Sequence, residues 1–181
     1  MPWMAAAIFG LLTGLGSCAK AETEAPPALP SYSPAEAALF DDTFSVDIFG
    51  SAAVEPPTAQ DKLRERVVLA DSVIPARITT VTRDAMGTIR GYTLTVKPTG
   101  PPMAGRAVTE PIQISIGPDS PAFVRVRSAE TTLVNQPLVL FLRYYEVDGT
   151  EQLHWRAESN TEAVRSAVSQ ATAVRAGRAG H

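Results

Sequence analysis

Cysteine and histidine are scarce in this chain, whose 181 residues include one cysteine and two histidines. A single cysteine cannot form a disulfide within the chain, which excludes a small disulfide-stabilised fold. Two histidines are too few for a multi-histidine metal site, and a formal net charge of -3 at pH 7 argues against bulk electrostatic binding of nucleic acid. We therefore expect no metal, no cofactor and no nucleic-acid partner.

Common catalytic motifs are also missing. The sequence holds no G-x-S-x-G, P-loop, G-x-G-x-x-G or H-E-x-x-H pattern. His154 lies beside Trp155 in a candidate strand, where a structural or surface role is expected, and Asp41 and Asp42 fall in a segment that reads as a solvated loop. We predict no enzymatic activity. The alternative is a hydrolase with an unrecognised site, which needs a cleft with convergent polar groups around Asp71 or His154.

The amino terminus has no charged side chain before Lys20, and residues 5–12 form its apolar centre. This pattern is typical of the apolar region of a secretory signal. The uncharged stretch is at the lower limit for spanning a hydrocarbon core of roughly 30 Å. We therefore predict a signal peptide over residues 1–17 rather than a retained transmembrane anchor.

The signal region ends in Leu15, Gly16, Ser17 and Cys18. These residues resemble the lipobox of bacterial lipoproteins, in which an aliphatic residue and two small residues precede an invariant cysteine. The resemblance covers only the signal region and implies cleavage between Ser17 and Cys18, with diacylglycerol on the thiol and acylation of the freed amine. Several acyl chains anchor a protein durably in a membrane. Ala19 in place of aspartate favours the outer membrane.

Two other interpretations of this region remain open. The segment Ala19, Lys20, Ala21 fits the A-x-A rule of an ordinary signal peptidase, which would cut before Glu22 and release a soluble exported protein. Alternatively, Cys18 is only a small apolar residue of the signal.

Residues 18–60 are predicted to form an acidic, proline-rich tether. Prolines at this density favour extended polyproline II structure, and residues 19–61 hold eight acidic residues against one basic residue. The remainder of the chain is correspondingly slightly basic.

One short ordered segment, residues 33–49, is expected within the tether. Ser33 and Glu36 form a capping-box pattern with Pro34 at the first helical position, which predicts one or two helical turns through about residue 40. The alternation that follows predicts a strand. Its apolar residues are expected to pack on the chain's own body, or alternatively to dock the chain on an envelope complex through residues 40–49. These residues are Phe40, Phe44, Ile48 and Phe49.

The body, residues 61–176, shows short apolar runs separated by turns and no long helix before its end. This pattern predicts a mainly-β fold, a small antiparallel barrel or sandwich, with an OB-like barrel as one option. The pair Asp148 and Gly149 predicts a tight hairpin, residues 160–175 a terminal helix, and residues 177–181 a frayed tail. The candidate strands lie within residues 66–82, 92–97, 112–116, 123–126, 138–142 and 153–156.

Arginines could form a basic face on this sheet. Arg125 and Arg127 alternate with valines in a candidate strand, so both would leave the same face. Arg77, Arg143 and Arg156 lie in neighbouring candidate strands. We expect either a face that binds polyanions, such as lipid headgroups or anionic glycans, or a solvated face with dispersed ion pairs.

The sequence therefore predicts a non-enzymatic, membrane-anchored lipoprotein of the cell envelope, whose body binds an envelope protein or an anionic envelope component. An accessory subunit that docks through residues 40–49 is the alternative from another class of function.

Overall fold

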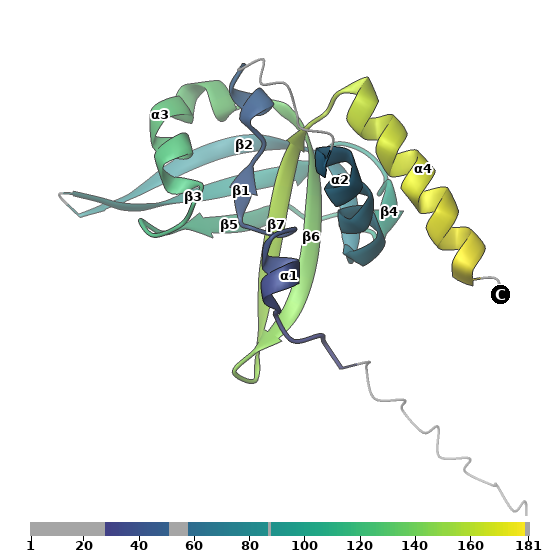
Figure 1. Ribbon diagram of the computed structural model, residues 1–181. Helices are drawn as coiled ribbons and strands as arrows, with labels where there is room; N and C mark the ends of the chain where they lie inside the picture. The colour runs from purple at the N-terminus through teal and green to yellow at the C-terminus, as the bar shows by residue number, and fades with distance from the viewer. Residues whose placement is uncertain (1–27, 51–57, 87, 180–181) are drawn as a thin grey trace, which may run out of the picture.

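The computed structural model describes residues 28–50, 58–86 and 88–179, and the sheet at its centre is a curled half-barrel (Figure 1). Its seven strands follow the order β1-β7-β6-β2-β3-β5, with β4 paired to the start of β2. The strands are β1 (Thr43–Phe44), β2 (Ser72–Met86), β3 (Thr88–Pro98), β4 (Ala104–Gly105), β5 (Ile112–Ile116), β6 (Pro137–Val147) and β7 (Thr150–Ser159). The helices are α1 (Pro34–Ala37), the 3-10 helix η1 (Val46–Phe49), α2 (Thr58–Leu69), α3 (Phe123–Leu133) and α4 (Glu162–Ala179).

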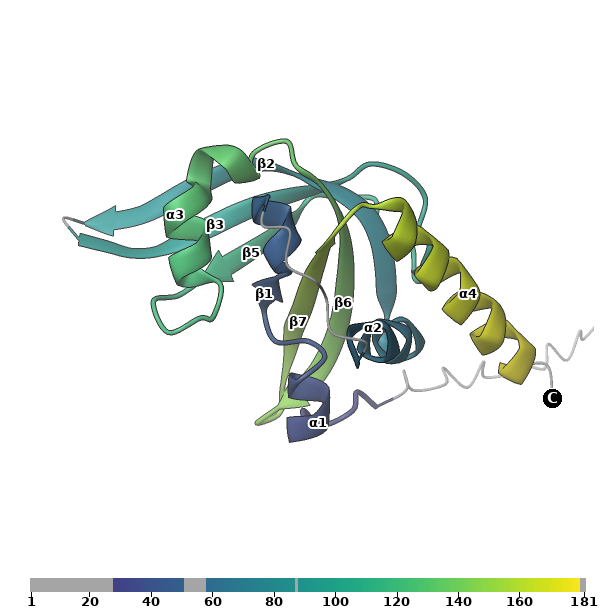
Figure 2. The ribbon, with the colours of Figure 1, turned by 45° about the horizontal axis from the view of Figure 1, so that its top comes forward.

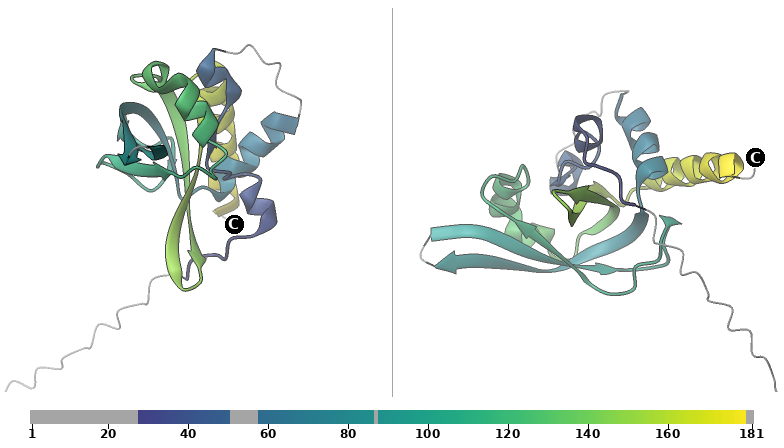
Figure 3. Two further views of the ribbon diagram at one scale, coloured as in Figure 1. Left: turned by 90° about the vertical axis from the view of Figure 1, so that its left-hand side faces the viewer. Right: turned by 90° about the horizontal axis from the view of Figure 1, so that it is seen from below.

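The predicted mainly-β fold with a carboxyl-terminal helix is confirmed. Two details differ from the prediction. The pair β1·β7 is parallel, so the sheet is mixed. In addition, the strand path ends at β1 and β5, so the sheet is a half-barrel and not a closed OB-like barrel (Figure 3).

Side-chain alternation accounts for the main strands. The apolar side chains of β3 and β5 pair across one face, with Leu94 opposite Ile114. The run 138–142 in β6 is buried on both faces and lies in the interior of the sheet, as predicted. Asp148 and Gly149 have φ angles of 51° and 72°, the left-handed geometry that a two-residue hairpin turn between β6 and β7 requires.

Helices cover both faces of the sheet and create two apolar cores. Figures 2 and 3 show α3 inside the curl, whereas α2 and α4 lie together on the other side of β6. The inner core contains Ile78, Leu94, Ile114, Phe123 and Leu140. The outer core contains Leu63, Val67, Val139, Phe141 and Val168. None of the helices in the described part of the chain is long and apolar enough to cross a membrane.

Two predicted strands are helices. Residues 67–69, expected in the first strand, form the last turn of α2, because Leu63 and Val67 present one apolar face at helical spacing. Residues 123–126 begin α3. Phe123 and Val126 are buried while Val124 is 70% exposed, so the burial follows a helical period. Four alternating residues are too few to distinguish the two periods.

The amino-terminal boundary of the body also lies earlier than predicted. Ser33 caps α1 and its hydroxyl bonds Glu36, as the capping box predicts, but the following residues form β1 and η1 rather than one strand. Phe40 and Phe44 are 0% and 1% exposed within the two cores, so the folded unit begins well before residue 61. At the other end, α4 continues to Ala179, beyond the predicted start of the tail at residue 177.

Phe40→Ala tests whether the amino-terminal segment belongs to the fold. Removing a fully buried phenylalanine ring leaves a cavity, so we expect a loss of about 3–5 kcal/mol in the free energy of unfolding, measured by urea denaturation. Val46→Ala, at a side chain that is 39% exposed, is the matched control and should cost less than about 1 kcal/mol. Equal effects of the two substitutions would contradict the packing described here.

Candidate functional site

Residues 30–45, which we call the strap, cross the outer face of the β6–β7 hairpin. At one edge, Ser31 forms a parallel bridge with Glu146 of β6. At the other edge, Phe44 pairs with Ala157 of β7. Figure 1 shows α1 passing in front of the hairpin between these two points. The strap is thus fixed by backbone pairing at both of its ends.

His154 lies under the strap and is contacted by two of its residues. The Tyr32 ring stacks on the imidazole with centroids 3.9 Å apart and an interplanar angle of 10°. The His154 Nδ1 lies 2.8 Å from Asp42 Oδ2, and the Trp155 N–H donates to Asp42 Oδ1 at 2.9 Å. Burial raises the pKa of the Asp42 carboxyl, although these two partners oppose the shift. Asp42 is therefore a specific contact of the strap and not a solvated loop residue.

A second group of charges joins the strap, the sheet and α2. Arg66 of α2 donates to Glu158 Oε1 at 2.8 Å and to the Leu39 carbonyl at 2.7 Å. The same Glu158 oxygen accepts from Arg156 at 3.0 Å, and Arg156 donates to both oxygens of Asp41 at 2.9 and 3.1 Å. The Arg66 and Glu158 side chains are only 6% and 8% exposed. We call these four charged residues the strap network.

Burial and charge act differently on the two arginines of the strap network. Burial lowers the pKa of the Arg66 guanidinium, and Glu158 counteracts part of this effect. Burial also lowers the pKa of Arg156, but the carboxylates of Glu158 and Asp41 outweigh it, and the net shift is upward. Removing a carboxylate from the network would therefore leave a cation with little access to water.

Two side chains under the strap each carry a buried polar atom that is not hydrogen-bonded. These atoms are His154 Nε2 and the Tyr145 hydroxyl oxygen, and neither has a hydrogen-bond partner among the described residues. Burial raises the pKa of Tyr145, so this phenol stays protonated at neutral pH. The part of the chain that the structure describes contains no cluster of three or more histidine, cysteine or acidic residues that could hold a metal ion.

A cavity of about 600 Å³ lies beside the strap, at the edge of β6 where β2 begins, and we call it the polar cavity because four charged residues line it. β2 starts at Ser72 opposite Leu142, so β6 continues beyond it without that neighbour. The volume falls within the usual range of ligand pockets. The cavity is lined by Ala28, Leu29, Pro30, Asp71, Arg106, Arg143, Tyr144 and Glu151.

Hydrogen bonds converge on Asp71 in the wall of this cavity. Its carboxylate accepts from Arg143 Nη1 at 3.1 Å and from the Tyr144 N–H at 2.8 Å. Its carbonyl accepts from the Arg106 N–H at 2.7 Å. Gly105, with a φ of 75°, permits this approach, because a Cβ at that position would lie 2.1 Å from the Asp71 carbonyl oxygen. The backbone of Arg106 is therefore held next to the first residue of β2.

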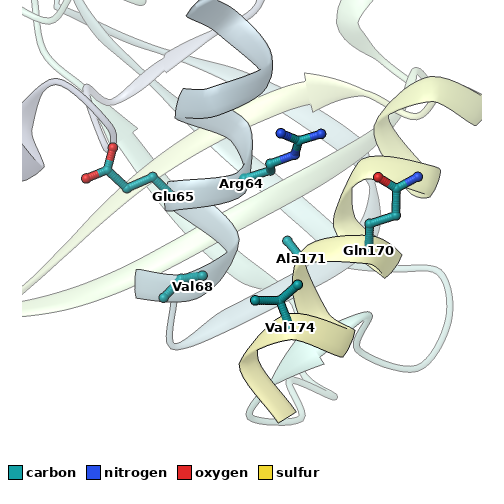
Figure 4. Close-up of a pocket in the computed structure, with 6 residues that line it drawn as sticks. All are labelled: Arg64, Glu65, Val68, Gln170, Ala171 and Val174. Carbon is teal, nitrogen blue, oxygen red and sulfur yellow. The ribbon is translucent and has the colours of Figure 1, made fainter. Parts of the chain in front are cut away.

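A second, more apolar hollow of about 400 Å³ lies between α2 and α4. Figure 4 shows Val68 of α2 across from Ala171 and Val174 of α4, with Arg64 and Gln170 above them. Val174 is 54% exposed, so water reaches this hollow.

The predicted basic face does not form. Arg125 and Arg127 lie on α3, where their spacing places them on different sides of the helix, and Arg125 donates to the Phe44 carbonyl. Arg143 binds Asp71, and Arg156 binds Asp41 within the strap network. These arginines are separated or neutralised, so we do not propose a polyanion face.

The other predicted site residues have different outcomes. Phe40, Phe44 and Ile48 are buried in the chain's own cores and Phe49 packs against them, so this segment does not offer a docking surface. Cys18 and the predicted cleavage after Ser17 lie outside the described residues. Asp71 lines the polar cavity, and His154 is not among the residues that line it.

Sequence reasoning missed Arg66, Glu158 and Arg106. Arg66 and Glu158 are 92 residues apart and their pairing requires the tertiary fold. Gly105 carried a local signal, because a lone glycine beside a charged residue after a proline-rich turn is a candidate for positive φ.

The strap network is tested by Glu158→Ala. The substitution leaves Arg66 buried without its carboxylate, so we expect the free energy of unfolding to fall by about 3–5 kcal/mol. Asp61→Ala removes an acid that is 82% exposed and pairs with Arg64 at 3.6 Å, and it should cost less than about 1 kcal/mol. A loss at Glu158 no larger than that at Asp61 in urea denaturation would contradict a buried network.

Comparisons with known proteins give no relative from which a function could be inferred. No family model, no curated protein and no solved structure matches this chain. The function must accordingly be argued from the signal region, the strap and the cavity.

Proposed function

We propose that the chain is an exported lipoprotein of the cell envelope, anchored through an acylated Cys18, whose body is a non-enzymatic binding module. The observation that carries this proposal is the position of the only cysteine directly after the apolar signal region and behind Leu15, Gly16 and Ser17. Ala19 favours the outer membrane as the destination. The polar cavity beside Asp71 is the ligand site of this module.

The connection between anchor and body supports the assignment of the cavity. Ala28, the first described residue, follows Cys18 by ten positions and lines the cavity. Ten residues span at most about 36 Å, so the acyl chains would keep the cavity close to the membrane surface. A ligand that is part of the membrane or lies next to it would therefore be within reach.

The composition of the cavity wall favours binding over catalysis. Both oxygens of Asp71 already accept hydrogen bonds from the protein, so this carboxylate is committed to the fold. Serine, cysteine and histidine are not among the described residues that line the cavity. The wall therefore offers no serine or cysteine nucleophile paired with a histidine base.

Soluble export is the second candidate, because the A-x-A pattern of Ala19, Lys20 and Ala21 follows the same signal region. In that case the mature chain would begin at Glu22 and contain no cysteine.

Mass spectrometry of the mature amino terminus, combined with detergent phase partitioning, distinguishes these two candidates. We expect the mass of diacylglycerol and a further acyl chain on Cys18, with the protein in the detergent phase. Cys18→Ser should accumulate unprocessed or mislocalised, whereas Ser17→Ala, which keeps a small residue before the cysteine, should be processed normally. A mature protein that begins at Glu22 and stays in the aqueous phase would overturn the lipoprotein assignment.

A further inference from the structure

We propose that the polar cavity takes a zwitterionic ligand, whose anionic group binds Arg106 and whose primary ammonium group binds Glu151. This inference rests on the proposed binding function and adds the chemical class of the ligand. Some charges of the cavity wall are paired with one another, and the ligand class follows from the charges that are not.

Four charged residues line the cavity, and two of them neutralise one another. Asp71 and Arg143 form an ion pair at 3.1 Å, and Glu36 lies 3.9 Å from Arg143 on another side. Arg106 and Glu151, in contrast, have no ionic partner within 4.0 Å among the described residues, and they do not contact each other. One exposed cation and one exposed carboxylate thus border the same cavity without an ion pair between them.

Each of these two side chains extends from a fixed backbone position. The N–H and the carbonyl of Arg106 are both bonded, to the Asp71 carbonyl at 2.7 Å and to the Ser72 hydroxyl at 2.8 Å. Glu151 is in β7, one residue after the start of that strand and next to the hairpin turn. Arg106 directly follows β4 and Glu151 is in β7, so a ligand between the two charges would be held from both sides.

Glu151 lies opposite a second exposed carboxylate. The residue directly opposite in the β6·β7 ladder is Glu146, so two carboxylates form a cross-strand pair. Like charges in this position destabilise a sheet. Glu146 is also the residue whose N–H donates to the Pro30 carbonyl at 3.0 Å, next to the cavity wall. An ammonium group bound at Glu151 would relieve this repulsion.

The apolar residues of the wall fit a ligand with a short carbon skeleton. Leu29 and Pro30 line the cavity beside the charged groups. The phosphoethanolamine headgroup of a lipid and a free amino acid are two such zwitterions, each with a primary ammonium group. Both carry an anionic group and a primary ammonium group, and the experiment below distinguishes between them.

The test is isothermal titration calorimetry on the full mature chain in detergent micelles. Phosphoethanolamine and alanine are the zwitterionic probes. Inorganic phosphate and ethanolamine are the comparison probes, because each carries charge of one sign only. We expect at least one zwitterion to bind about tenfold or more tightly than either single charge. Arg106→Gln and Glu151→Gln should each reduce that affinity about tenfold or more. Binding of phosphoethanolamine but not of alanine assigns the lipid headgroup as the source, and binding of alanine alone assigns an amino acid.

Arg90→Gln and Glu110→Gln change charges that are exposed, as Arg106 and Glu151 are, but that do not line the cavity; they are the matched controls and should leave the affinity unchanged. If inorganic phosphate binds as tightly as phosphoethanolamine, the ligand is not recognised as a zwitterion, although the cavity still binds a ligand. If neither zwitterion binds, or if the controls lower affinity as much as the cavity variants, the inference fails. Acylation of Cys18 has its own readout, so the lipoprotein assignment stands or falls separately.

Discussion

The buried strap network is the interaction on which the rest of the structure depends. Glu158 joins Arg66 of α2 to Arg156 of β7, and Arg156 in turn binds Asp41 of the strap. Breaking a buried ion pair on one side costs about 3–5 kcal/mol, which is a large share of the 5–15 kcal/mol that stabilises a typical domain. The network therefore makes the strap an integral part of the fold, although it lies in an acidic and proline-rich stretch of the sequence.

The strap also relates the fold to the proposed function. Its amino-terminal end at Pro30 is paired to β6, and the residues directly before it line the polar cavity. Any lipid on Cys18 would thus be connected to the cavity wall by only a short piece of chain. Gly105 permits the close backbone approach to Asp71 that positions Arg106, a residue of the cavity wall, beside the start of β2.

Sequence reasoning succeeded where the signal is local and repeated. The hairpin at Asp148, the doubly buried run 138–142 and the terminal helix follow from turn chemistry and periodicity, and the structure contains all three. It failed at α3, where four alternating residues were compatible with either period. It could not reach the pair of Arg66 and Glu158 or the cavity, because these join residues that only the tertiary fold brings together.

The central claim, that the strap is docked as firmly as the sheet, is tested most directly by native-state hydrogen exchange. The amides of Asp42 and Ser45 donate to carbonyls of β7 at 2.9 and 2.8 Å. Their protection should match that of amides in β6, because the strap network allows them to open only with the global unfolding of the domain. Strap amides that exchange at nearly the rate of an unfolded chain, while β6 remains protected, would contradict this account.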